Sequence, residues 1–144
     1  MPRVTVTLNG FSITISSKDM QEDDSLDLSP GAWAETLGWD PVKVKKALRT
    51  LDAQQHTPRR VNCQQGQNRS PTMAVLYLWW KSEFTLGAAF DAVNQAYGAL
   101  QLPLGTVKMQ RLLEQLLGAY TSMLRPDWND VRALVPGNAA ELLP

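Results

Sequence analysis

The chain has 144 residues, of which 44% are hydrophobic and 19% are charged, a composition that suits one globular domain with a buried core. Its net charge is zero, which argues against a dedicated nucleic-acid or membrane-surface binder, because such proteins usually carry a basic excess. One cysteine and one histidine exclude an internal disulfide and a Cys- or His-based metal cage, so no metal and no cofactor are expected.

No apolar stretch is long enough for a membrane helix, and the N-terminus lacks the apolar core of a signal peptide. The sequence therefore predicts a cytoplasmic protein without membrane insertion, and export by a signal-less route to a host cell is left open. The sequence does not indicate an oligomeric state.

Charge is uneven along the chain, with a net of −5 over residues 1–40 and +6 over residues 41–70. This pattern indicates either a solvated helix face beside balancing acids or a local positive field that attracts an anion.

The first half of the chain begins with strand signals. Over residues 1–15, apolar and polar residues alternate on both sides of Asn9-Gly10, which predicts a β-hairpin or two strands. Residues 16–31 are polar and acidic and are predicted to form a loop, followed by a short helix over 32–37. Asp40-Pro41 is a helix start, with Asp40 as the cap, and this helix is predicted to reach about residue 54. Residues 59–62 are expected to form a short strand that leads into Cys63.

Helical periodicity dominates the second half. It predicts helices at about 71–80, 86–100 and 106–124, so that most of residues 71–125 is helical, and a short helix near Pro126. Trp79, Trp80 and Tyr77 are interpreted as packing residues. The fold expected for residues 1–144 is therefore a single compact α/β domain, with a small sheet of about three strands and a helical C-terminal half.

Residues 61–70 carry the chemistry, because they place a cysteine and an arginine between a predicted strand and a predicted helix. In such a turn, successive loop amides and the helix N-terminus point at one spot and favour negative charge. Gly66 permits a tight backbone path, and Arg69 can bind two phosphate oxygens. The same dipoles favour the thiolate of Cys63, which would then be a nucleophile beneath a bound phosphate, and Ser70 could donate a hydrogen bond to its sulfur.

Cys63 to Arg69 matches the Cys-x5-Arg signature, and the chain resembles the cysteine-dependent phosphatases, most closely their dual-specificity branch. The likeness extends through Ser70 and the apolar helix behind it, covers roughly residues 4–120, and is dense only from 61 to 80. Asn62 stands where the family usually has histidine, and the region upstream of the cysteine is short. Ser70-Pro71 is also similar to the low-molecular-weight branch, which we rank second because helices rather than strands follow the loop.

The resemblance implies catalysis through a phosphocysteine on Cys63, with Ser70 assisting. It also implies a phosphate held by Arg69 and by the backbone of the loop residues Gln64, Gln65, Gly66, Gln67 and Asn68. The general acid that such a reaction needs is not marked by a motif. Asp19 is the first candidate because it follows the Ile13/Ile15 strand, Asp24 is the second, and Asp23 and Asp27 share their loop.

The side chains of the loop are uncharged, which favours a singly phosphorylated group. We therefore expect a protein phosphatase acting on phosphotyrosine and, as an extension, on phosphoserine or phosphothreonine in a protein substrate. Three alternatives stay open: a pseudo-phosphatase or phosphate-binding module without an efficient general acid, an RNA or phosphoinositide phosphatase that would use Arg59 and Arg60, and an unrelated α/β protein with a structural Cys63.

Overall fold

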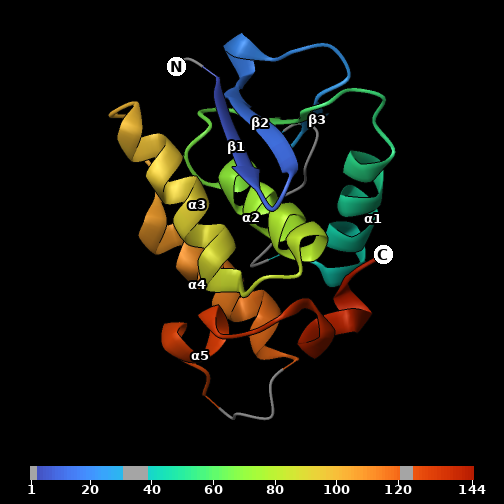
Figure 1. Cartoon of the computed structure of the whole chain (residues 1–144), viewed down its shortest axis with the longest axis vertical. Helices are drawn as coiled ribbons and strands as arrows, with labels where there is room; N and C mark the ends of the chain where they lie inside the picture. Colours follow the sequence, from blue (N-terminus) through green and yellow to red (C-terminus); the bar gives the residue numbers. More distant parts are fainter. Residues whose placement is uncertain (1–2, 31–38, 121–124) are drawn as a thin grey trace.

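The structure is a computed structural model that describes residues 3–30, 39–120 and 125–144. Its sheet has the strand order β1-β2-β4-β3, formed by β1 (Val4–Leu8), β2 (Phe11–Ser17), β4 (Arg59–Cys63) and β3 (Leu26–Asp27). β1 and β2 are antiparallel, whereas β4 is parallel to both of its neighbours. Figure 1 shows α2 behind the β1–β2 hairpin, with α3 and α1 on either side. The predicted mixed α/β fold with a small sheet and a helical second half is confirmed.

The hairpin forms as predicted. Asn9 and Gly10 have positive φ angles of 48° and 82°, as a two-residue turn with the right-handed twist of the strands requires. Val4 and Val6 are buried, and Thr5 and Thr7 are exposed, so one face of this ribbon packs on the helices. The Asn9 side chain donates a hydrogen bond to the Ser82 carbonyl (3.1 Å), which attaches the turn to the end of α2.

The prediction of an irregular loop over residues 16–31 is wrong in part. β2 continues through Ser17, a short 3-10 helix η1 (Lys18–Met20) follows, and β3 adds a fourth strand where about three strands were expected. β3 has no strand signal of its own, because its pairing partner is β4, which lies more than thirty residues further along the chain. The helix predicted over 32–37 lies outside the described residues.

The helices agree with the predicted ones except at their ends, and residues 121–124 of the helix predicted over 106–124 lie outside the described residues. They are α1 (Pro41–Asp52), α2 (Arg69–Ser82), α3 (Leu86–Ala99), α4 (Thr106–Gly118) and α5 (Trp128–Arg132), followed by a 3-10 helix η2 (Pro136–Leu142) that was not predicted. Asp40 caps α1 by accepting from the Val42 amide (2.9 Å), and Thr85 caps α3 by accepting from the Ala88 amide (3.2 Å). α2 begins two residues earlier than predicted.

α2 is the central helix of the molecule. All of its residues from 70 to 79 are buried, because the sheet, α1, α3 and α4 pack around it. A helix that is apolar on every side is typical of a core position. Its N-terminus is therefore held rigidly at the end of β4, where Cys63 lies.

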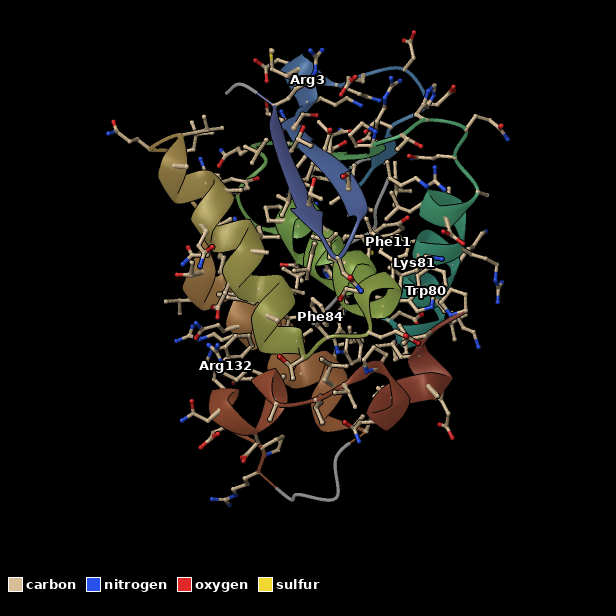
Figure 2. The ribbon with its side chains drawn as sticks, viewed as in Figure 1. Arg3, Phe11, Trp80, Lys81, Phe84 and Arg132 are labelled. Carbon is tan, nitrogen blue, oxygen red and sulfur yellow. The ribbon has the colours of Figure 1, made fainter. Side chains whose placement is uncertain are left out.

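The aromatic residues at the far end of α2 serve packing, as predicted. Trp79 is fully buried, and its indole donates to the Leu134 carbonyl (2.9 Å). Figure 2 shows Phe11, Trp80 and Lys81 together near the hairpin turn. The Lys81 ammonium lies 4.7 Å from the centroid of the Trp80 ring and 5.6 Å from that of Phe11, within cation–π range. Across the described parts of the chain, none of the helices combines the length and apolarity needed to cross a membrane.

Candidate active site

Cys63 is the last residue of β4, the strand that has parallel neighbours on both sides. Ligands of α/β proteins bind beyond the carboxyl ends of parallel strands, so this is the edge of the sheet where a site is expected. The side chain is buried, with 5% of its surface exposed. Ser17 is its register partner on β2, and the amide of the next residue, Lys18, donates to the Gln64 carbonyl (3.2 Å).

The Cys63 sulfur has two hydrogen-bonding neighbours. The Gly66 amide donates to it (N to Sγ 3.3 Å), and the Ser70 hydroxyl lies 3.0 Å from it. Ser70 is completely buried in the first turn of α2, so its hydroxyl is held against the sulfur. Both groups can donate a hydrogen bond to the sulfur, and they fix its position beneath the residues that follow β4.

Residues 64–68 form a loop that turns back over Cys63, which we call the Cys63 loop. Gly66 sits at φ 71°, a left-handed conformation that glycine adopts without strain. Three carbonyl groups of the loop accept hydrogen bonds from three different elements. These bonds are Lys18 N to Gln64 O (3.2 Å), Tyr97 Oη to Gly66 O (2.6 Å) and Gly105 N to Gln67 O (2.9 Å).

The outward carbonyls determine where the next amides point. In a trans peptide the N–H is antiparallel to the preceding C=O, so the amides of Gln65, Gln67 and Asn68 point away from those three partners. Among the described residues, none accepts a hydrogen bond from these three amides. Adjacent backbone amides that share one concave side make an anion-binding nest. The Gly66 amide contacts the sulfur, and the three amides that have no acceptor among the described residues belong to the same short loop.

Arg69 begins α2 and reaches the same edge of the sheet. Its guanidinium donates to the carbonyl of Leu28 (3.1 Å), the residue that follows β3. A guanidinium carries five N–H donors in a planar fork, and the bond to Leu28 orients this fork at the edge of the sheet. The structure thus brings Cys63, Arg69, Ser70 and the Cys63 loop together at one edge of the sheet.

The residue before the cysteine connects the site to β3. Asn62 is fully buried; its side chain donates to Asp27 Oδ1 (3.0 Å) and accepts from the Ser25 hydroxyl (2.7 Å). Its carbonyl accepts from the Leu28 amide (2.7 Å). The Asn62 side chain therefore joins β4 to β3 and to the residue before it by hydrogen bonds, a role that a single sequence does not reveal.

Of the acidic candidates, Asp19 and Asp27 lie beside the site. Asp19 is in η1, directly after β2, and accepts a hydrogen bond from the Ser17 hydroxyl, which lowers the pKa of its carboxyl group. Burial acts to raise the pKa of Asp27, but hydrogen bonds from Lys18 and Ser29 outweigh this effect and lower it. Both groups are therefore stabilised as carboxylates.

Asp23 and Asp24 contact residues at the other end of β4. The Asp24 carboxylate lies 3.3 Å from Nε2 of His56, and the Asp23 carbonyl accepts from the Arg60 guanidinium (2.8 Å). Arg59, the first residue of β4, donates to the carbonyls of His56 (2.7 Å) and Asp52 (3.2 Å). Because Cys63 ends the strand that Arg59 begins, these contacts hold both arginines and both aspartates at the end of β4 opposite the Cys63 loop.

Tyr97 is a site residue that the sequence analysis missed. It lies on α3, with 1% of its surface exposed, and its hydroxyl contacts the Cys63 loop. Burial raises the pKa of its phenol strongly, and the nearby Cys63 charge raises it further. Its pattern in the sequence is that of a core residue, so only the contact itself could show this role.

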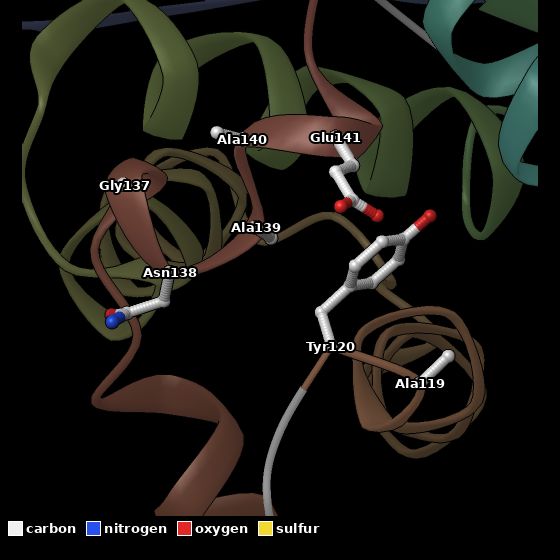
Figure 3. Close-up of a pocket in the computed structure, with 7 residues that line it drawn as sticks. All are labelled: Ala119, Tyr120, Gly137, Asn138, Ala139, Ala140 and Glu141. Carbon is white, nitrogen blue, oxygen red and sulfur yellow. The ribbon is translucent and has the colours of Figure 1, made fainter.

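A separate cavity of about 460 Å³ lies between the end of α4 and η2. Figure 3 shows the hydroxyl of Tyr120 pointing toward the carboxylate of Glu141 in this cavity, with alanine and glycine residues around them. α4 has 13 residues and contacts the Cys63 loop at its N-terminus, so this cavity is about 20 Å from the loop. No group of three or more potential metal-ligating side chains is found in the described ranges.

No protein-family model matches the chain, and no curated protein sequence matches it. Among solved structures, the chain is similar to the crystal structure of Tk-PTP in the active form. The two are 17% identical, with 72% of this chain and 75% of that chain covered, and the TM-score is 0.44. A similarity at this level does not assign an activity, which has to be argued from the geometry of the site.

Proposed function

We propose that the protein is a cysteine-dependent phosphatase that hydrolyses phosphotyrosine in a protein substrate. The observation that supports this proposal best is the position of the Cys63 sulfur, which the Gly66 amide and the Ser70 hydroxyl contact at the base of a loop whose other amides have no acceptor among the described residues. A structural thiol would need neither the polar neighbours nor the nest. An anion-binding nest without chemistry would not need the thiol.

The proposed reaction proceeds in two displacements at phosphorus. The amides of the loop and Arg69 bind the three peripheral phosphate oxygens and balance their charge. The Cys63 thiolate attacks phosphorus, an S–P bond forms, and the bond to the tyrosine oxygen breaks. Water then attacks the phosphocysteine, the S–P bond breaks, and inorganic phosphate leaves. The Ser70 hydroxyl donates to the sulfur as the thiolate reforms.

The pKa directions favour an aryl leaving group. Asp19 and Asp27 are the acidic groups described beside the loop, and the pKa of each is lowered, so a protonated carboxyl is scarce near neutral pH. A tyrosine oxygen, with a pKa of about 10, can leave with far less protonation than an alkoxide of serine or threonine. Phosphotyrosine is therefore preferred over phosphoserine and phosphothreonine.

The loop side chains also favour a singly phosphorylated group. Gln64, Gln65, Gln67 and Asn68 offer no positive charge for a second phosphate. Arg59 and Arg60 are held by protein carbonyls and by Glu22 at the other end of β4. Neither arginine supports the alternative of an RNA or phosphoinositide substrate.

A second function is supported by the same carboxylates. If neither Asp19 nor Asp27 delivers a proton to the leaving oxygen, the site would bind phosphorylated groups and turn them over very slowly. This is the phosphate-binding module, or pseudo-phosphatase. It shares the loop and Arg69 with the enzyme and differs from it only in turnover.

The test is hydrolysis of an aryl phosphate without added metal, because an aryl leaving group needs little protonation. Wild type should show turnover, and Cys63→Ser and Arg69→Lys should each lose at least about a hundredfold in kcat/KM. Arg60→Lys is the matched control, since it alters a partly buried arginine at the other end of β4 and should keep wild-type activity. Vanadate binding without turnover in the folded wild type would favour the binding module. Absence of both would contradict the proposal.

A further inference from the structure

We propose that Tyr97 is a positioning residue of the phosphate site, which acts by holding the Gly66–Gln67 peptide with its amide toward the bound anion. The inference rests on the proposed function and deepens it. Tyr97 comes from α3, more than thirty residues after Cys63, and its hydroxyl donates a hydrogen bond of 2.6 Å to the Gly66 carbonyl.

The contact determines the orientation of a peptide that could otherwise flip. Gly66 has no side chain to restrict its ψ angle, and its φ of 71° lies in a region open to several loop conformations. If the Gly66 carbonyl turned inward, the anion would meet a negative carbonyl oxygen in place of the Gln67 amide. The Tyr97 hydroxyl stabilises the outward carbonyl and thereby excludes that arrangement.

Burial strengthens the contact. Tyr97 has 1% of its surface exposed, and Gly66 is buried as well, so the contact is shielded from bulk solvent. A donor on the carbonyl side of a peptide also polarises its N–H, which makes the Gln67 amide a better donor to an anion. The neighbouring carbonyl of Gln67 is held in the same way by the Gly105 amide, so two successive peptides are oriented from outside.

The experiment compares Tyr97→Phe with Tyr77→Phe. Tyr77 is also buried, with 2% of its surface exposed, but its phenol interacts with Arg59 and Asp52, at the end of β4 opposite Cys63. Both variants remove one buried hydroxyl, so both should lower the melting temperature. Only Tyr97→Phe should weaken inorganic phosphate and vanadate binding, by about tenfold at 25 °C, and lower kcat/KM by a similar factor.

A second measurement uses the unmutated protein and does not depend on the folding of a variant. In an amide-proton NMR titration with inorganic phosphate, the Gln67 resonance should move downfield as its N–H becomes a hydrogen-bond donor to the anion. An unchanged Gln67 resonance in a protein that binds phosphate would overturn the proposal.

The outcomes separate this inference from the proposed function. Equal phosphate affinity in wild type and Tyr97→Phe, or equal losses in Tyr97→Phe and Tyr77→Phe, would reduce Tyr97 to a structural residue while Cys63-dependent turnover stood. Phosphate binding without turnover in wild type would contradict the proposed enzymatic activity. The role of Tyr97 in phosphate binding could still be tested by comparing the two variants. A wild type that binds neither phosphate nor vanadate would contradict both.

Discussion

At the scale of single residues, the Cys63 loop is shaped by partners that carry no reactive groups. The Lys18 amide, the Tyr97 hydroxyl and the Gly105 amide each take up one carbonyl of the loop. A loop of five residues has too few internal contacts to hold one conformation against the entropy of its backbone. External hydrogen bonds of this kind allow the free amides to be oriented before an anion binds, which lowers the cost of binding.

A substitution at Gly105 tests how much space there is between this residue and the Cys63 loop, which its amide contacts. A Cβ atom at this position would lie 1.8 Å from Oδ1 of Asn68 and 3.2 Å from the Gln67 carbonyl oxygen. Oδ1 of Asn68 is buried and has no hydrogen-bond partner among the described residues, so it occupies the space that the added methyl group would need. We expect Gly105→Ala to displace the loop, to destabilise the protein by about 1–3 kcal/mol in urea unfolding, and to reduce kcat/KM at least tenfold.

Gly98→Ala is the matched control, because its Cβ would meet no atom of the described residues within 4 Å and the residue lies in α3. This change should stabilise the protein by about 0.5–1 kcal/mol, since alanine is the better helix former. Wild-type activity in Gly105→Ala would show that the loop tolerates displacement from this side.

At the scale of elements, β4 places Cys63 at the edge of the sheet where the parallel strands end. It is held there because it pairs with β2 on one side and with β3 on the other. β2 was predicted from its alternation and the turn before it, and its register with β4 places Ser17 beside Cys63. β3 has only two residues, and its stability comes from pairing with Val61 and Asn62 and from the hydrogen bond between Asn62 and Asp27. The hairpin is in turn attached to α2 through Asn9 and Ser82.

The hairpin turn yields a stability prediction. Gly10 has φ 82°, and in the described part of the chain a Cβ added there meets nothing within 4 Å, so its replacement is penalised by backbone conformation alone. Gly10→Ala should lower the free energy of unfolding by about 1–2 kcal/mol in urea denaturation. Gly137→Ala, also without contacts within 4 Å, should change it by less than about 0.5 kcal/mol. Equal effects would indicate that the turn does not hold the positive φ in solution.

At the scale of the whole molecule, Asp27 connects three parts of the chain. Its carboxylate pairs with Lys18 in η1 and accepts hydrogen bonds from Ser29 and from Asn62 of β4. These contacts favour the charged form and hold the pKa of Asp27 below the ordinary value of 3.8 in spite of burial. Folding is therefore linked to the ionisation of this group.

This linkage has a definite sign. Because the pKa of Asp27 is lower in the folded protein than in the unfolded chain, the stabilisation is present above pH 3.8 and is lost as the pH falls through the folded pKa. The urea midpoint of wild type should therefore fall more steeply below pH 3.8 than that of Asp27→Asn. Parallel pH profiles of the two proteins would contradict a lowered pKa at this site.

Much of the fold could be read from local patterns. The Asn9-Gly10 hairpin, the Asp40 helix cap and the strand before Cys63 each follow from residues close in sequence, and all are present. β3 and η2 could not be read in this way. β3 depends on pairing with a strand far along the chain, and η2 has neither the length nor the periodicity of an α-helix.

The same distinction between features set by neighbouring residues and features set by distant residues applies to the candidate site. The sequence by itself determined that Cys63, Gly66, Arg69 and Ser70 share one short turn between a strand and a helix, because their spacing leaves the chain little choice. Only the tertiary structure decided that Asn62 bonds to Asp27, that Asp24 turns to His56, and that Tyr97 holds the Gly66 carbonyl. These contacts join residues more than thirty positions apart, and they depend on the packing of α3 against α2 and β1 and on the pairing of β3 with β4, which no local pattern encodes.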